Sequence, residues 1–180
     1  EIYKNIFDTD ITFPNLTTIQ NSGMKSCFKS TGNPTGSTKK KLSFPALTSI
    51  GVSGLEEGCR QYCAFNTVEF NSLVEISSEK ALYNFAYTSS GGHYFTTVSF
   101  PLLKTVSGSQ AIFNAFYNQA DITTISFPEL ETISGNNGMY CAFSNCSSVT
   151  TLSLPKLKNV TGEYGMGYFA SSSLDRKSDV

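Results

Sequence analysis

The sequence contains no Trp, a single His and few charged residues, and each shortage narrows the possible functions. Charged residues make up 15% of the chain and leave a formal net charge of -1, so nothing favours nucleic acid as a partner. Every apolar run is shorter than the roughly 20 residues of a membrane helix, so we expect no membrane insertion of this segment. Glu1 opens the chain without an initiator Met or a signal peptide, and we therefore expect a fragment or a processed product.

The scarcity of His and of phosphate-binding motifs argues against catalysis. With His93 as the only histidine, neither a Ser-His-Asp triad nor a His-based metal site is credible. His93 lies in the Gly-rich stretch "SSGGHYF", where a solvated loop is the simpler interpretation. The stretch "TGNPTGSTKKK" lacks the Gly-Lys-Ser/Thr ending of a phosphate loop and is more simply a flexible basic insertion. We predict no metal, no cofactor and no enzymatic activity.

The five cysteines do not form a recognisable metal or disulfide pattern. Cys59 and Cys63 are four residues apart, but no second pair supports a zinc site. Small apolar filling of a core is the better interpretation for most of the five. We predict that most are free and buried, with Cys59–Cys63 as the one plausible local bridge. The remaining cysteines are Cys27, Cys141 and Cys146.

What the sequence does contain is a repeated motif of the form [Ile/Val/Leu]-Ser-[Phe/Leu]-Pro-x-Leu-x-x-[Ile/Val]. It occurs six times, with Thr12 and Glu69 in place of Ser in the first and third copies and Asn71 in place of Pro in the third. The stretch "TTISFPELETISG" has the counterparts "TTVSFPLLKTVSG" before it and "TTLSLPKLKNVTG" after it. Successive anchors are 31, 26, 30, 27 and 27 residues apart, a period typical of solenoids. The six anchor residues are Phe13, Phe44, Phe70, Phe100, Phe127 and Leu154.

Each repeat also has a second half with an apolar residue that returns to the interior. A Phe follows the anchor by 15 or 16 residues in five copies. In the second copy, Gly51 to Tyr62 is expected to be an insertion that displaces Phe65 by five residues. Phe65 is then expected to fill the position that Phe95 occupies before its own anchor. The five second-half phenylalanines are Phe28, Phe85, Phe116, Phe143 and Phe169.

The positions within one repeat predict a coil of a solenoid. Apolar residues alternate with Ser or Thr before the anchor, as in a strand with one buried face. The following Pro has no N–H, so strand pairing should stop there. Six stacked coils then bury a continuous core that one coil cannot bury alone. The glycines Gly108, Gly135 and Gly162, which follow the apolar line, suit turns with positive φ.

The stretch "AFSNCSSVTTLSLPKLKNVTG" (Ala142 to Gly162) resembles the leucine-rich repeat of the BspA type, found in surface proteins of bacteria. The resemblance covers the chain from Ile11 to Phe169. It implies a right-handed, mainly-β solenoid with a parallel sheet of about six strands on its concave face and an irregular or short-helical convex side. It also implies attachment at the cell surface or outside the cell. We expect one domain over residues 1–180, with a polar tail from about residue 171.

These observations favour a non-catalytic cell-surface module that adheres to a host or cell-surface protein or glycan. A structural spacer or stalk segment is the alternative. A polysaccharide-acting solenoid enzyme is a remote third, because such enzymes need grouped acids. Here Asp10 and Glu69 fall two coils apart, in different columns of the predicted sheet.

Two candidate binding regions follow from this arrangement. The first is a rim formed by insertions at Thr31 to Lys41, Gly51 to Tyr62 and Thr88 to Tyr94, because long insertions commonly carry recognition. Its proposed contact residues are Lys39, Lys40, Arg60, Tyr62 and Tyr94. The second is the sheet face, whose outward residues are Lys41, Glu69, Thr97, Ser99, Thr124, Ser126, Thr151 and Ser153. Tyr residues crowd the second halves of the repeats, where a packing role and a contact role both stay open.

Overall fold

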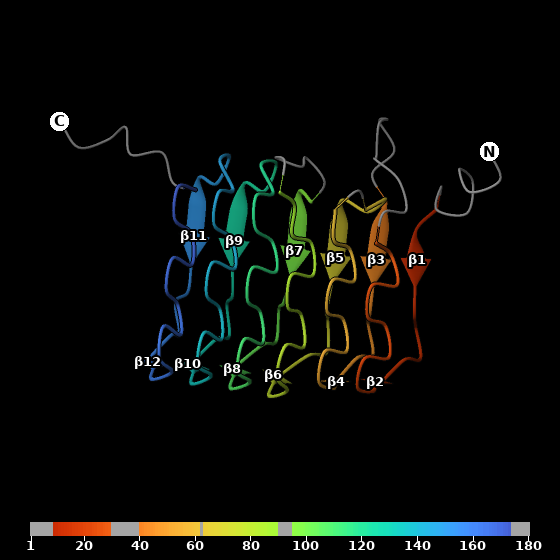
Figure 1. Cartoon of the computed structure of the whole chain (residues 1–180), viewed down its shortest axis with the longest axis horizontal. Coiled ribbons are helices and arrows are strands. Elements are labelled where there is room, and N and C mark those ends of the chain that lie inside the picture. Colours follow the sequence, from red (N-terminus) through yellow and green to blue (C-terminus); the bar gives the residue numbers. More distant parts are fainter. Residues whose placement is uncertain (1–8, 30–39, 62, 90–94, 174–180) are drawn as a thin grey trace.

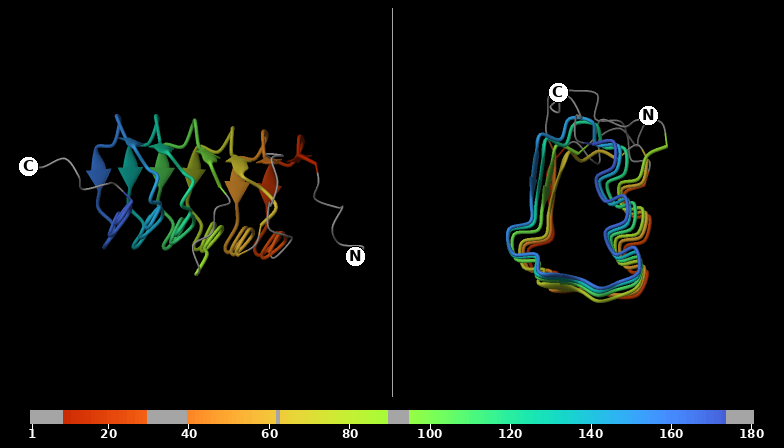
Figure 2. Two further views of the ribbon diagram at one scale, coloured as in Figure 1. Left: turned by 90° about the horizontal axis from the view of Figure 1, so that it is seen from above. Right: turned by 90° about the vertical axis from the view of Figure 1, so that its left-hand side faces the viewer.

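The computed structural model describes residues 9–29, 40–61, 63–89 and 95–173. These residues form a mainly-β parallel solenoid of about five turns. The coils stack along a nearly straight axis, with the two termini at opposite ends (Figures 1 and 2). The predicted solenoid is therefore confirmed. Helices were one option for the convex side, but the described ranges contain none.

Each coil has three walls, which the end view in Figure 2 shows as one straight side, one base and one corrugated side. The strand wall is the face expected to be concave. The turn wall is the corrugated side and comprises residues 20–29, 51–61, 77–88, 107–118, 134–145 and 161–172. The strand wall consists of β1 (Ile11–Thr12), β3 (Lys41–Ser43), β5 (Thr67–Glu69), β7 (Thr97–Ser99), β9 (Thr124–Ser126) and β11 (Thr151–Ser153). The second wall consists of β2 (Thr18–Ile19), β4 (Ser49–Ile50), β6 (Glu75–Ile76), β8 (Thr105–Val106), β10 (Thr132–Ile133) and β12 (Asn159–Val160).

The predicted anchor residues form a stack inside the strand wall. Phe13, Phe44, Phe70, Phe100 and Phe127 follow one another with ring centroids 4.9 to 5.5 Å apart and planes within 17° of parallel. Each such pair adds about 0.5–1.5 kcal/mol beyond the burial of its area. The stack therefore sets the spacing of the coils, which explains why the phrase repeats.

The Phe-Pro-x-Leu segment turns the chain from the strand wall into the second wall. Phe127 donates its N–H to Ser153 of the next coil (3.0 Å), and Pro128 then offers no further donor. Leu130 donates its own N–H back to the carbonyl of Phe127 (3.4 Å), which closes a β-turn with Pro at its second position. The predicted end of strand pairing at the Pro is confirmed.

The turn wall uses its backbone N–H groups alternately within and between coils. Phe113 donates to Gln110 of its own coil (3.3 Å), and the next residue, Asn114, donates to Tyr140 of the following coil (3.0 Å). Every fourth residue has a left-handed conformation, as at Gln110, Asn114 and Asn118, with φ of 54°, 50° and 65°. Between these positions, pairs such as Ala115–Phe116 point into the core. The corrugation follows from this four-residue rhythm.

The expectation that Gly51 to Tyr62 is an insertion is wrong for the described part, 51–61. Ser53 and Leu55 donate their N–H groups to Glu79 and Ala81 of the next coil (3.0 and 2.9 Å), so this segment is a regular part of the turn wall. The coil looked out of phase because Cys59 occupies an inward position that Phe fills in three other coils. Phe65 is buried five residues before its anchor, in the position predicted for it.

The glycines after the second wall serve a different purpose from the one predicted. None of Gly108, Gly135 and Gly162 has a positive φ. Instead they stack on one another, and a Cβ on Gly135 would lie 2.1 Å from the carbonyl oxygen of Gly108. Glycine is needed at these three positions because a Cβ there would collide with the carbonyl of the preceding coil.

Candidate binding faces

The hydroxyl columns predicted on the strand wall are present. Thr67 pairs with Thr97, and Ser126 pairs with Ser153, in parallel register. The two predicted charges of this face neutralise each other, because Lys41 Nζ lies 3.2 Å from Glu69 Oε1. The outward surface of β7, β9 and β11 is thus an array of Thr and Ser without charge.

The strand wall is split between β7 and β9. Strand β7 is the last strand of a four-stranded sheet, and β9 pairs with β11 in a separate sheet. The same two coils remain paired through β8 and β10 and through the turn wall, where Asn114 donates to Tyr140. Figure 1 shows β7 and β9 farther apart than the other neighbours in this row. Between these two coils, only one of the three walls has therefore opened, whereas the second wall is interrupted elsewhere, between β4 and β6.

The split leaves main-chain groups without the partners that their equivalents have. The carbonyls of Lys40, Asn66 and Thr123 each accept two N–H groups from the next coil, at distances between 2.8 and 3.2 Å. The equivalent carbonyl, that of Thr96, accepts neither the N–H of Thr123 nor that of Thr124. One acceptor and two donors therefore face the opening.

A second gap in the pairing occurs at the anchor residue. The N–H of Phe100 does not reach the carbonyl of Ser126. Four other anchors make the corresponding bond: Phe13 to Ser43, Phe44 to Glu69, Phe70 to Ser99 and Phe127 to Ser153. The interruption thus runs along the whole strand.

A cleft of about 330 Å³ occupies the split. None of its lining residues is charged. Val98 is half-buried in its floor, whereas Val68 and Ile125 at the same position of other coils are buried, so the opening exposes an apolar surface. The lining residues are Thr96, Thr97, Val98, Ser99, Phe100, Pro101, Thr123, Thr124, Ser126 and Pro128.

A buried glutamine holds the corner that leads into β7. Gln119 lies on the corner between the turn-wall segment 107–118 and β9, and its Nε2 donates to the carbonyl of Ala86 (2.5 Å) on the preceding turn-wall segment, 77–88. Its Oε1 accepts the N–H of Phe95 (3.1 Å), two residues before β7 begins. At the same position of later coils, Cys146 donates its thiol to the carbonyl of Phe116 (3.2 Å). A side chain therefore fixes the start of β7 to the coil of β9.

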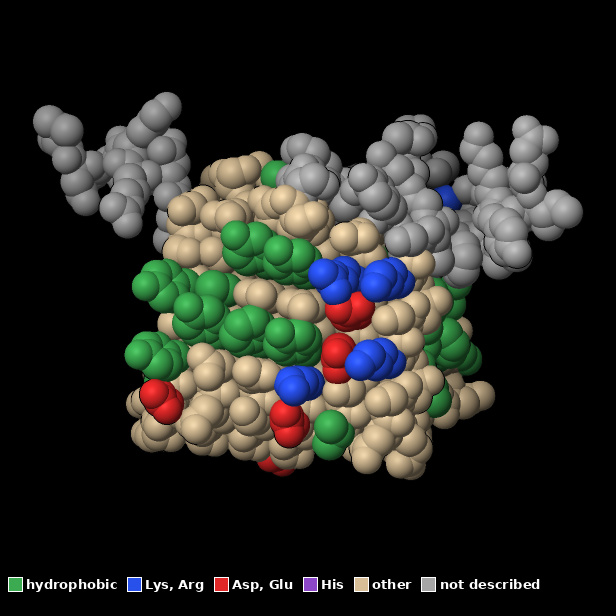
Figure 3. All heavy atoms as spheres, viewed as in Figure 1, with side chains coloured by type: hydrophobic (Ala, Val, Ile, Leu, Met, Phe, Trp, Pro, Cys, Tyr) green, Lys and Arg blue, Asp and Glu red, His purple; other side chains and the backbone are tan. Residues whose placement is uncertain are grey.

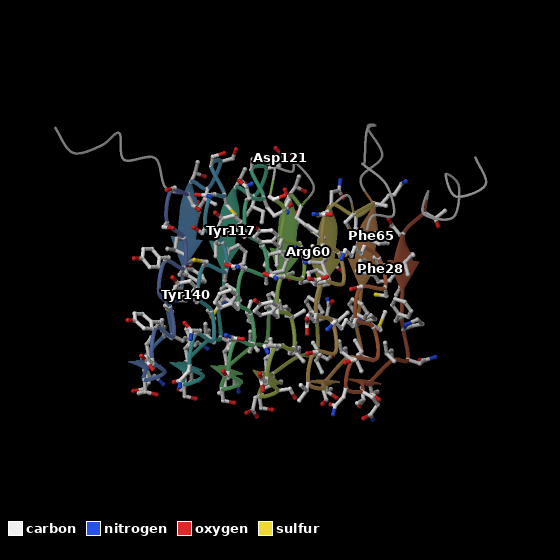
Figure 4. The ribbon with its side chains drawn as sticks, in the orientation of Figure 1. Phe28, Arg60, Phe65, Tyr117, Asp121 and Tyr140 are labelled. Carbon is white, nitrogen blue, oxygen red and sulfur yellow. The ribbon has the colours of Figure 1, made fainter. Side chains whose placement is uncertain are left out.

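The turn wall carries two rows of aromatic side chains that run across the coils (Figures 3 and 4). Row one consists of Tyr83, Phe113 and Tyr140, with ring centroids 5.1 and 5.2 Å apart and planes within 15° of parallel. Row two consists of Tyr87 and Tyr117, whose centroids are 5.2 Å apart. All five side chains are half-buried. Tyr crowding was the only sequence signal of these rows, because their positions depend on the turn geometry.

Cations cap both rows at their N-terminal ends. The guanidinium of Arg60 lies 5.5 Å from the ring centroid of Tyr87, and Lys80 Nζ lies 6.0 Å from that of Tyr83. Arg60 also pairs with Glu57, which Lys29 contacts at 3.1 Å. Burial raises the pKa of Glu57, but its hydrogen bond to Lys29 and the charge of Arg60 outweigh this effect and lower the pKa below its usual value of 4.5.

The C-terminal end of row one is a cluster of three tyrosines. The ring of Tyr140 meets those of Tyr164 and Tyr168 nearly at right angles, at centroid distances of 6.4 and 5.6 Å. Tyr164 and Tyr168 are 63% and 64% exposed. Desolvation, followed by the neighbouring Cys141 thiol and Tyr168, raises the pKa of Tyr140. This cluster is the most exposed group of aromatic rings on the described surface.

Only part of the predicted rim lies within the described residues. Lys39, Tyr62 and Tyr94 lie outside the described residues, as does His93. Lys40 and Lys41 lie at the start of β3, whereas Arg60 lies on the turn wall beside Tyr87 (Figure 4). Arg60 thus belongs to the aromatic rows and not to a loop. The rim stays a prediction.

All five cysteines are free, and three of them, Cys59, Cys63 and Cys146, are buried. Burial raises the pKa of Cys146 to about 12. Desolvation of the Cys27 thiol, whose residue is partly open to solvent, raises its pKa to about 11. The described ranges contain no group of three or more His, Cys, Asp and Glu side chains placed to hold a metal ion. No helix that could cross a membrane occurs among the described residues.

Comparison with known protein families, with curated proteins and with solved structures finds no match to this chain. The fold itself therefore defines the class: the protein is a mainly-β parallel solenoid.

Proposed function

We propose that this protein is a non-catalytic interaction module and that it binds a protein partner through the two aromatic rows of the turn wall. The observation that carries the proposal is the joint presentation of Tyr83, Phe113 and Tyr140 beside Tyr87 and Tyr117. Tyr and Arg dominate the residues that contribute most to protein–protein binding. Both types occur here, on a rigid wall that loses little entropy on binding.

The orientation of the rings favours a protein over a glycan at this face. A sugar that stacks on an aromatic side chain needs a free ring face. The two faces of Phe113 are covered by Tyr83 and Tyr140, whose planes lie within 15° of its own. The rows therefore offer ring edges and Tyr hydroxyls, which suit the mixed polar and apolar surface of a protein.

Attachment at a bacterial cell surface, and the BspA-type repeat itself, belong to the same proposal. Their support is the resemblance of the repeated phrase and the parallel solenoid that this phrase builds. A wall of stacked repeats suits adhesion because each added coil extends the same contact surface with the same backbone structure. A spacer role would need no aromatic rows at the surface.

The test is a binding screen of the whole chain against an array of extracellular proteins, followed by titration of each hit. Two variants report on the turn wall. The pair Tyr83→Thr and Tyr87→Thr removes a ring from each row, and Asn114→Asp places a charge between the rows at a left-handed position that Asp tolerates. We expect each to weaken binding at least tenfold. The pair Thr151→Lys and Ser153→Lys, on the strand wall, is the matched control and should leave binding unchanged.

The outcomes separate the proposal from its competitors. Binding that survives both turn-wall variants, or that the strand-wall control abolishes, contradicts the use of the aromatic rows. If no array protein binds saturably, the spacer role is favoured instead. Thermal unfolding of every variant shows whether a loss of binding is only a loss of fold.

A further inference from the structure

We propose that the cleft between β7 and β9 is a separate binding site and that it takes a neutral polyhydroxylated ligand, namely a sugar residue of a glycan. The site lies on the strand wall and does not depend on the aromatic rows. Its volume of about 330 Å³ falls at the small end of ligand pockets. It can therefore hold a small ligand, not a folded domain.

The main chain of the split supplies the first part of the recognition. The carbonyl of Thr96 and the N–H groups of Thr123 and Thr124 lack the partners that the equivalent groups have in the neighbouring coils. Thr96 is half-buried and Thr123 and Thr124 are exposed, so water or a ligand can satisfy these backbone groups. A sugar hydroxyl donates and accepts at once, so it can bond to a carbonyl and to an N–H on opposite sides of the cleft.

The side chains supply the second part. Four hydroxyl-bearing residues line the cleft: Thr97 and Ser99 on β7, and Thr124 and Ser126 on β9. The half-buried Val98 and two prolines add apolar contacts for the C–H faces of a pyranose ring. No lining residue carries a charge that could compensate an ionic ligand. The lining thus selects a neutral ligand with many hydroxyls.

An extended peptide is the competing occupant, because open strand edges also accept strands. An inserted strand would have to lie about 4.8 Å from each neighbour, which requires about twice the normal spacing between β7 and β9. The pairing of β8 with β10 and the turn-wall bond from Asn114 to Tyr140 hold the same two coils together. These links oppose such an opening, so a sugar residue fits better.

The test is an NMR titration of the whole chain with neutral saccharides: glucose, galactose, mannose, N-acetylglucosamine and their disaccharides. We expect at least one to shift the backbone amides of Thr123 and Thr124 in a saturable way, with millimolar affinity. The double variant Thr97→Val and Thr124→Val keeps the shape and removes two hydroxyls. It should weaken binding at least fivefold, because the sugar hydroxyls that face the two positions lose their partners.

The control is Thr151→Val, which removes a hydroxyl of the same column where β9 and β11 are paired. It should bind the saccharide like the unaltered chain. Amide exchange in the free protein provides an independent readout: Thr124 should exchange faster than Thr151. Equal protection of the two amides would overturn the split, and the absence of saccharide shifts, or shifts unchanged in the double variant, would overturn the ligand class. Protection of Thr124 by an extended Thr/Val peptide, with no effect of sugars, would assign the cleft to peptides instead.

Discussion

The ring of Tyr140 lies over the backbone of Gly167 in the last described coil. A Cβ on Gly167 would lie 2.9 Å from Cδ2 and 3.0 Å from Cε2 of that ring. Gly167 occupies the row-one position of its coil, so the row ends where a side chain is missing. Tyr140 fills this gap, and Tyr164 and Tyr168 flank it.

Gly167→Ala should therefore disturb the tyrosine cluster. Gly167 has no positive φ, so the backbone accepts Ala, and the loss comes from the collision with Tyr140. Because the ring is half-exposed and can move, we expect a loss of about 1 kcal/mol, the lower end for overpacking. Urea unfolding measures it. In a Tyr140→Ala background the same substitution should be neutral, and an equal loss in both backgrounds would contradict the contact.

Phe127→Ala should lower the free energy of unfolding by about 3–5 kcal/mol, because this ring is 1% exposed and stacks on Phe100 at 5.5 Å. Since coils couple to their neighbours, the damage should appear as partial unfolding of the C-terminal half. Amide hydrogen exchange, measured residue by residue, shows which coils have unfolded. Phe13→Ala, in the half-buried first coil, is the control and should have a smaller effect. A loss below about 1 kcal/mol at Phe127 would contradict the stack.

The thiols should stay reduced and react slowly in the folded protein. A pKa of about 12 for Cys146 means that very little thiolate exists at mildly alkaline pH, and burial blocks access as well. Mass spectrometry after alkylation without reductant should find no bridge, and Cys146 should be labelled fully only after unfolding. The control is the reduced, unfolded chain, in which all five cysteines must be labelled. Two or more native bridges would contradict this prediction.

The ionic cluster at the end of row two should make stability depend on acid pH. The lowered pKa of Glu57 means that the folded state favours the charged carboxylate, so its contribution is present above pH 4.5 and is lost as the pH falls below this value. The effect should be below about 1 kcal/mol, because surface ion pairs contribute little. Glu57→Gln should flatten the pH dependence of unfolding in this range. Glu79→Gln, which removes the carboxylate that pairs with Lys80, should change it less.

The strand wall was predictable because each of its features has a sequence period. The anchor stack from Phe13 to Phe127 and the columns of Thr97 and Ser99 follow from alternation and from the spacing of Pro. The turn wall was not, because its left-handed positions hold residues as unlike as Gln110 and Tyr164, which carry no common signal. The turn wall is held together by backbone hydrogen bonds, which do not depend on the side chain at each position.

The second coil and the split show two further limits of the sequence. The second coil has Cys59 where three other coils have a Phe, so the sequence pattern predicted an insertion at 51–61. The backbone hydrogen bonds of this segment are nevertheless regular. The split is invisible because Thr124 and Ser126 repeat the residue types of Thr151 and Ser153, which are paired. The difference lies in the contacts made at Gln119, five residues before Thr124, with residues of an earlier repeat that are distant in sequence.

The alternation of bonds in the turn wall also has a mechanical consequence. All bonds between coils run along the solenoid axis, so a force that pulls the two ends apart loads them one coil at a time, from an end inward. Detaching one coil shortens the column by only about 4.8 Å but releases about 27 residues, or roughly 90 Å of extended chain. The bonds within each coil, such as that from Phe113 to Gln110, do not resist this force because they hold no other coil. A tethered copy of this protein would therefore lengthen in steps under tension and shield whatever is bound to its remaining coils from sudden load.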